Sequence, residues 1–191
     1  MNQTYPIPEA IYFAPKRPKA PRSKLTRAIL FAWFLAFIVS IVVLTAASVN
    51  APAAASTAAP VVNPSAADVF YLEKVNALRA QNGLSPVRLL LELNESSTDK
   101  ATVMATNHYW GHYDPDGKAF SDYIWKRVPP ATLVGENLAR CYPTRDQAYA
   151  ALDASPTHHE IMVGNFNFMG VSEAYDSSMG CTITVMHFAR I

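Results

Sequence analysis

The sequence predicts an α+β domain, in which helices cover an antiparallel sheet, preceded by a helix that spans a membrane. Three observations lead to this fold class. Residues 28–47 form a charge-free, largely apolar run, residues 68–107 carry apolar side chains at helical spacing, and residues 168–191 are rich in β-branched and aromatic side chains. Helices followed by strands in this way are typical of α+β proteins.

The apolar run, AILFAWFLAFIVSIVVLTAA, contains twenty residues without a charge. At about 1.5 Å per residue, such a helix crosses a hydrocarbon core about 30 Å thick. Six basic residues and one acid precede it, and no charge follows until Asp68. This asymmetry predicts a basic cytoplasmic tail over residues 1–27, a signal anchor over residues 28–49 and an exported C-terminal part. The alternative is a signal peptide cleaved near TAASVNA, which would release a secreted domain.

The segment after the anchor is expected to be a flexible spacer. Residues 50–67 hold fourteen Ala, Pro, Ser or Thr in eighteen positions and offer nothing that could form a core. The remaining domain, residues 68–191, is of a common single-domain size. Residues 28–191 carry ten basic and fourteen acidic side chains, a net charge of −4 without a basic stripe. We therefore expect no nucleic-acid partner.

Four helices are expected in the first part of the domain. The first begins near Asp68, with Asp68 or Ser65 available as cap, and ends at Gly83. Asn76 and Arg79 within it are expected to make internal polar contacts. The other helices are expected from near Leu90 to Asn107, in AFSDYIWKRV, and in TRDQAYAALDA with Thr144 as cap.

Strands are expected in the last part of the domain. FMGVSEAY and CTITVMHFARI are joined by DSSMG, which predicts a terminal hairpin whose outer strand ends the chain. TLVGENLA is a further candidate for an extended segment. Both cysteines, Cys141 and Cys181, fall in the exported part, where oxidation is permitted, so a disulfide is favoured over two free thiols.

Three short segments concentrate residues that could perform chemistry: GHYDPDG, VGENLA and SPTHHEIMVG. Several known sites are excluded. An EF-hand loop beginning in DPDG would need a glutamate where Trp125 stands, so DPDG is interpreted as a turn. The zinc-protease pattern HExxH is broken by Val163, and neither a GxSxG elbow nor a glycine-rich phosphate loop is present.

The order of NALRAQNGLSPV, GHYDPDG, GENLA, SPTHHEIMVGNFNFMGV and TITVMHFA resembles the CAP superfamily of cysteine-rich secretory, antigen 5 and pathogenesis-related proteins, most closely its bacterial branch. The resemblance covers about residues 68–190 and rests on several collinear motifs. It implies a three-layer α-β-α sandwich with a surface cleft where two histidines and acidic residues converge.

By position, the resemblance implies that His112, Glu136 and His158 are the cleft residues. Two neutral imidazoles can hold a zinc or copper ion, while a carboxylate serves as a third ligand or orients one ring. The expected cofactor, if there is one, is therefore zinc bound by His112, His158 and Glu136.

The sequence also departs from the family pattern. Some members have a second cleft glutamate before the second histidine, where ALDASPTH offers only Asp153. Asp153 or Glu160 is the available substitute, and a shift of one residue would bring His159 into the place of His158.

Two functions follow from these expectations. The first is a binding module at the cell surface, whose cleft recognises a peptide, glycan, lipid, protein or metal ion. The alternative is a metal-assisted hydrolase of peptides, glycans or esters that uses the same residues, with Glu136 as the base. The sequence does not choose between them, because one fold supports many functions.

Overall fold

The computed structural model describes residues 13–14 and 63–191. The helices in this part of the chain are α2 (Ala66–Gln81), α3 (Leu91–Asn107), α4 (Phe120–Arg127), α5 (Arg145–Ala154) and α6 (Pro156–Met162). The strands are β1 (Phe13–Ala14), β2 (Arg88–Leu89), β3 (Leu133–Arg140), β4 (Phe168–Asp176) and β5 (Cys181–Arg190).

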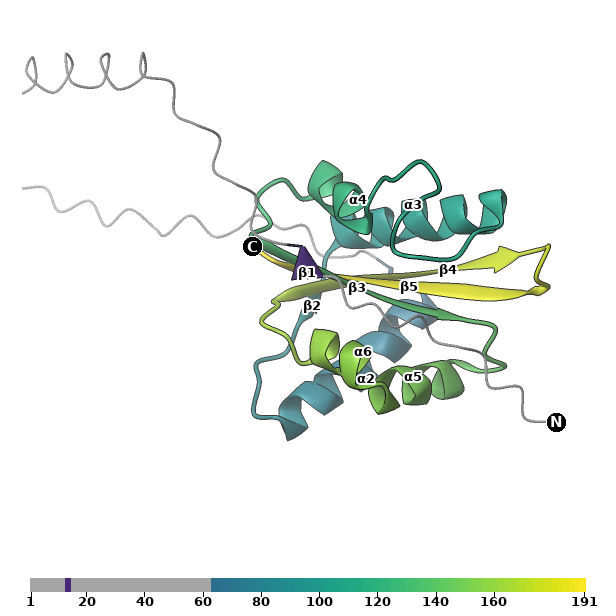
Figure 1. The fold of residues 1–191 in the computed structure, drawn as a ribbon. Coiled ribbons are helices and arrows are strands. Elements are labelled where there is room, and N and C mark those ends of the chain that lie inside the picture. The colour runs from purple at the N-terminus through teal and green to yellow at the C-terminus, as the bar shows by residue number, and fades with distance from the viewer. Residues whose placement is uncertain (1–12, 15–62) are drawn as a thin grey trace, which may run out of the picture. The chain divides into compact units, whose positions relative to one another are not determined.

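One sheet with the strand order β1-β3-β5-β4-β2 lies between two helical layers (Figure 1). Helices α3 and α4 cover one face, and α2, α5 and α6 cover the other. All neighbouring strands pair antiparallel except β2 and β4, which pair parallel. The expected mixed α-β-α architecture is therefore present.

The last strand does not lie where the sequence analysis placed it. β4 and β5 form the predicted hairpin, but β5 pairs with β4 on one side and with β3 on the other. The prediction of an outer final strand is wrong, because the segment TLVGENLA forms a full strand, β3, beside it. This central position explains why the residues of β5 from Ile183 to Ala189 are all buried.

The four expected helices form close to their predicted ends. Ser65 caps α2 in a capping box: its hydroxyl accepts the Asp68 amide at 3.1 Å, and the Asp68 carboxylate accepts the Ser65 amide at 2.7 Å. Gly83 follows the helix at φ +68°, a conformation that favours glycine. Thr144 caps α5 through the amide of Gln147. The short helix α6 was not predicted.

Two polar residues of α2 make hydrogen bonds inside the domain, as expected. Arg79 donates to the backbone carbonyls of Met162, Gly164 and Phe166, and so joins α2 to the loop that leads into β4. Asn76 exchanges two hydrogen bonds with the backbone of Val87.

Helix α3 lies unusually close to the sheet at Gly170 of β4. A Cβ atom at this position would fall 2.2 Å from the carbonyl carbon of Leu93 and 2.3 Å from the amide nitrogen of Asn94. Only glycine permits this approach, because any side chain would collide with the helix backbone. The close approach brings the first turns of α3, which include Ser96, over the centre of the sheet.

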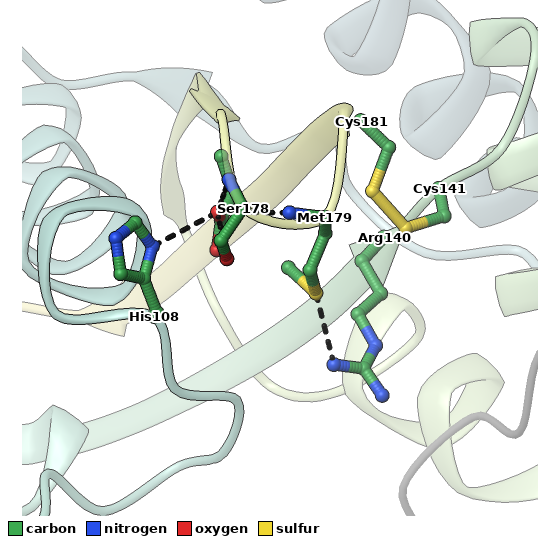
Figure 2. Close-up of a disulfide and its surroundings, with 7 residues drawn as sticks. His108, Arg140, Cys141, Ser178, Met179 and Cys181 are labelled. Atoms are coloured by element: carbon green, nitrogen blue, oxygen red, sulfur yellow. Dashed lines mark hydrogen bonds and ion pairs between the residues drawn. A yellow bond between two sulfur atoms is a disulfide. The ribbon is translucent and has the colours of Figure 1, made fainter.

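The predicted disulfide between Cys141 and Cys181 is present and joins the end of β3 to the start of β5 (Figure 2). Beside it, the tip of the β4–β5 hairpin is held by Asp176, which pairs with His108 at 3.0 Å and accepts the Ser178 hydroxyl at 2.7 Å. The disulfide and this buried carboxylate fix the same end of the sheet.

The predicted anchor over residues 28–49 and residues 50–62 of the predicted spacer lie outside the described residues. The last two residues assigned to the spacer, Ala66 and Ala67, begin α2 instead. Within the described part of the chain, none of the helices has the length and apolar character needed to cross a membrane. β1, which falls within the predicted cytoplasmic tail, pairs antiparallel with β3, Phe13 opposite Gly135 and Ala14 opposite Val134. A single span at residues 28–47 and this pairing exclude one another within one molecule, because the span would separate the two strands.

Candidate functional site

Glu136 lies at the centre of a buried polar cluster. It stands on β3 opposite His187 of β5, and its side chain is fully buried. One carboxylate oxygen, Oε1, lies 2.6 Å from Nδ1 of His112, and the other, Oε2, lies 3.0 Å from Nε2 of His187. Ser96 of α3 completes the cluster, since its hydroxyl lies 2.7 Å from Nδ1 of His187.

Glu136 is held in its ionised form. Burial by itself would raise its pKa, but the hydrogen bonds and charges of His112 and His187 outweigh burial and lower the pKa below the ordinary value. An ionised carboxylate only accepts hydrogen bonds, so both rings must donate to it. In its neutral form, His112 therefore carries its proton on Nδ1, and Nε2 is the nitrogen with ligand character.

His158 reaches the same region from the opposite helical layer. It lies in α6, whose position on β3 is fixed by Asn137, which donates to the His158 carbonyl at 2.9 Å. The imidazole is buried, its Nδ1 lies 2.8 Å from the Ser155 hydroxyl, and its buried Nε2 has no hydrogen-bond partner among the described residues. Burial, with a contribution from the charge of His112, lowers the pKa of His158 to about 4. His158 is therefore a neutral imidazole at physiological pH.

The loop that carries His112 is anchored by a second buried cluster. Asp114 accepts hydrogen bonds from Lys100 of α3 at 2.8 Å, from the Tyr109 hydroxyl at 2.5 Å and from the Tyr123 hydroxyl. Burial alone would raise the pKa of Asp114, but these donors outweigh it and lower the pKa. Asp114 lies within the DPDG turn, closed by the amide of Gly117 on its carbonyl. The turn was predicted, but the buried ion pair beneath it was not.

The structure brings the three predicted site residues together in part. Glu136 and His112 are in direct contact, and the charge of His112 contributes to the lowered pKa of His158. His159 does not replace His158, because it lies half-exposed and pairs with Asp153 at 2.8 Å. With Asp153 engaged by His159 and Glu160 exposed, a substitute for the second cleft glutamate stays a prediction.

The sequence analysis missed His187 and Ser96. A signal for His187 was available, because VMHFA places one ionisable residue inside an otherwise apolar strand. A buried histidine in such a strand needs a polar partner, and Glu136 is that partner. Ser96 gave no signal, since a serine within a helix is common.

Family comparison identifies the domain. The profile of the family described as "CAP: Cysteine-rich secretory protein family" matches residues 72–188. The chain belongs to the CAP family. Among curated proteins, none matches the chain.

Solved structures with the same fold come from several bacteria. An outer surface protein of Borrelia burgdorferi is similar with a TM-score of 0.61 and 18% identity, over 68% of this chain and 96% of that one. An extracellular SCP-domain protein of Bacillus anthracis is similar with a TM-score of 0.58 and 19% identity, over 64% of this chain and 40% of that one. A cysteine-rich secretory protein of Staphylococcus aureus is similar with a TM-score of 0.51 and 13% identity, over 64% of this chain and 38% of that one. This chain spans less than half of the latter two, and identities this low show the fold alone.

The side chains of this CAP domain fit a metal ion only incompletely. Among residues 63–191, no group of three or more His, Cys, Asp or Glu side chains is arranged to hold an ion. Both oxygens of Glu136 face imidazole nitrogens, which suits the orientation of His112 better than service as a third ligand. The buried Nε2 of His158, which no described residue engages, has the character of a ligand.

Two cavities of the CAP domain lie away from the histidines. One, of about 280 Å³, is lined by residues that include Tyr71, Thr144 and Thr184, and the other, of about 330 Å³, by residues that include Ser65 and Asn94. Both are bordered by the ion pair of Arg145 and Glu173, at 2.7 Å. None of His112, Glu136 and His158 lines either cavity.

Proposed function

We propose that this chain is an extracytoplasmic binding module, held at the cell membrane by a single span at residues 28–49, with its CAP domain outside the cytoplasm. If the span is cleaved, the domain is secreted. Residues His112, Glu136 and His158 form its recognition site. The family match supports the extracellular class, and the charge asymmetry about the apolar run supports the orientation.

The observation that carries this proposal is the buried arrangement of Glu136 between two imidazoles, with His158 beside it. Buried ionisable groups are unfavourable unless they are paired, and the cluster pairs Glu136 twice while no described residue pairs with Nε2 of His158. Perturbed titratable groups of this kind concentrate at functional sites. The ligand classes that suit the site are a peptide, glycan, lipid, protein surface or metal ion.

If zinc is the ligand, Nε2 of His112 and Nε2 of His158 are the nitrogens that would hold it. A bound zinc ion supplies Lewis acidity and a water of lowered pKa. In that case Glu136 fixes the ring orientation and the tautomer of His112, and Ser155 fixes the ring of His158.

Calorimetric titration of zinc into the full-length chain tests this part of the proposal. One-to-one binding is expected in the wild type, with a loss of affinity of at least about tenfold in His112→Ala and in His158→Ala. His159→Ala is the matched control, because His159 neighbours His158 but lies half-exposed against Asp153. A folded wild type that binds no zinc, or equal losses in all three variants, would remove zinc from the ligand classes.

A metal-assisted hydrolase is the second candidate, and the lowered pKa of His158 favours it. A buried imidazole that stays neutral down to about pH 4 can bind a metal ion without competition from a proton. Since Glu136 is engaged by two rings, its role there is to position His112, and His112 and His158 would hold the ion.

Glu136→Gln separates the two candidates. In a hydrolase, this variant should lose turnover of peptide, glycan or ester substrates by about 10- to 100-fold, because His112 loses its orientation. In a binding module, the wild type turns over none of these substrates, and Glu136→Gln should change only the affinity for the ligand. Circular dichroism checks that the variant stays folded, and the absence of any wild-type turnover with and without zinc counts against the hydrolase.

Protease protection tests the membrane topology. A C-terminal epitope tag on the intact cell surface should be removed by added protease, while an N-terminal tag should be protected. Recovery of the C-terminal tag in the culture supernatant with a shortened chain supports the secreted form instead.

A further inference from the structure

The outer edge of β3 presents backbone hydrogen-bonding groups beside the histidine cluster. Cys141 directly follows β3 and donates its amide to the Thr182 carbonyl at 2.9 Å. Because Cys141 and Thr182 continue the β3–β5 register, alternation in an antiparallel ladder turns residues 135, 137 and 139 toward β5. The amides and carbonyls of Val134 and Glu136 therefore point to the opposite, outer edge.

The alternation decides which residues of β1 can bond to β3. Ala14 stands opposite Val134, and Phe13 stands opposite Gly135. Only the first of these can be a hydrogen-bonded pair, since the groups of Gly135 are turned to β5. A short antiparallel strand thus lies on the outer edge of β3, and the next hydrogen-bonding position along that edge belongs to Glu136.

The position of this edge relates it directly to the site. The carboxylate of Glu136 projects to the face of α3 and α4, where it meets His112. His158 belongs to α6, which lies against the other face of β3 through Asn137. A strand on the outer edge of β3 therefore passes the backbone of Glu136, whose strand lies between the layer of His112 and the layer of His158.

The chain's own β1 does not suit this role in an anchored protein. With a single span at residues 28–47, Phe13 and Ala14 are on the cytoplasmic side and β3 is outside. In that topology the edge of β3 is open to an extended segment of another polypeptide.

We propose that the ligand of this site is an extended segment of another protein, which adds as an antiparallel strand to the outer edge of β3. It exchanges backbone hydrogen bonds with Val134 and Glu136 and places an apolar side chain opposite Gly135. This inference rests on the proposed function and names the ligand class. It is the strand-addition mode of peptide recognition, in which the backbone provides affinity and alternate side chains provide specificity.

The preference for an apolar residue follows from what surrounds Gly135. Cross-strand neighbours project to the same face of a sheet. On the face of Gly135, a Cβ atom would lie 2.9 Å from Phe166 and 3.3 Å from Ile161. A large apolar side chain in the added strand packs against these two residues, whereas the residue opposite Glu136 projects to the face of His112.

The test uses the full-length chain in detergent micelles with Ala14→Pro, which removes the amide that pairs β1 with Val134. The probe is a fluorescent synthetic octapeptide, EAIYFAPK, the sequence of residues 9–16. Its affinity is measured by fluorescence anisotropy. Methylation of the amide of the second alanine, which corresponds to Ala14 and faces β3, should weaken binding about tenfold or more, because one backbone hydrogen bond is lost.

Matched peptides control for the loss of flexibility on methylation. The same peptide methylated at the phenylalanine amide, which points away from β3, should keep its affinity within about threefold. Replacement of the phenylalanine by aspartate should weaken binding about tenfold or more, since the side chain faces Phe166 and Ile161.

Each outcome decides something. Equal losses from the two methylated peptides, or no peptide binding by a folded variant that still binds zinc through His112 and His158, overturn strand addition and leave the binding site in place. If the folded variant binds none of the probes (peptide, zinc, glycan or lipid), the proposed function is overturned together with this inference.

Discussion

Two buried carboxylates lie on the same side of the sheet, and their surroundings differ in one respect. Asp114 is enclosed by a lysine and two phenols, a closed set of donors that satisfies both oxygens. Glu136 is enclosed by two imidazoles, each of which has a second nitrogen. The donors of the first cluster are bound to its carboxylate, whereas the second nitrogen of each imidazole in the second cluster can bind a further group, as that of His187 binds Ser96. Burial of a charge therefore does not by itself mark a functional site; the chemistry of its partners does.

The largest expected effect concerns the closed cluster. Lys100→Met leaves Asp114 buried without its cation, so the free energy of unfolding should fall by about 3–5 kcal/mol. Urea denaturation measures the loss. Lys126→Met, at an exposed position of α4, is the control and should change stability by less than about 0.5 kcal/mol. Combination with Asp114→Asn should recover part of the loss, and a loss below about 1 kcal/mol in Lys100→Met would show that the ion pair is not buried as described.

The next effect concerns acid. The unfolded chain takes up a proton on His158 below about pH 6.5, while the folded protein resists it until about pH 4. The stability contributed by neutral His158 is therefore complete above pH 6.5 and is lost as the pH falls toward 4. The loss should approach about 1.4 kcal/mol per pH unit and about 3 kcal/mol in total. Denaturation between about pH 4.5 and 6.5 should show a flatter profile for His158→Asn but not for His159→Asn; identical profiles for all three proteins contradict the buried neutral ring.

The smallest effects separate the clusters most sharply. Ser96→Ala and Tyr123→Phe each remove one hydroxyl from a buried carboxylate cluster, and each should lower stability by about 1 kcal/mol. Only Ser96→Ala should also lower zinc affinity, because His187 then holds Glu136, and through it His112, less firmly. If Tyr123→Phe lowers zinc affinity equally, the two clusters act as one unit and the distinction between them fails.

Much of the fold could be predicted from local patterns. Apolar spacing indicated α2 and α3, and Ser65 and Thr144 indicated caps, because helix ends depend on hydrogen bonds within a few residues. The order of strands could not be predicted in this way. The placement of β5 between β3 and β4 depends on which segments pair, and β3 and β5 lie about forty residues apart along the chain. β-branched composition carries no information about such neighbours.

Residue type and order were enough to indicate the family, the disulfide, the candidate residues His112, Glu136 and His158, and the candidate apolar span. Three features emerged only when the chain was folded. Glu136 holds His187 as well as His112, His158 rather than His159 is buried, and Val134 and Glu136 turn their backbone groups to the outer edge of β3. Burial and register arise when distant segments pack together, and a shift of a single residue reverses both, so local patterns do not determine them.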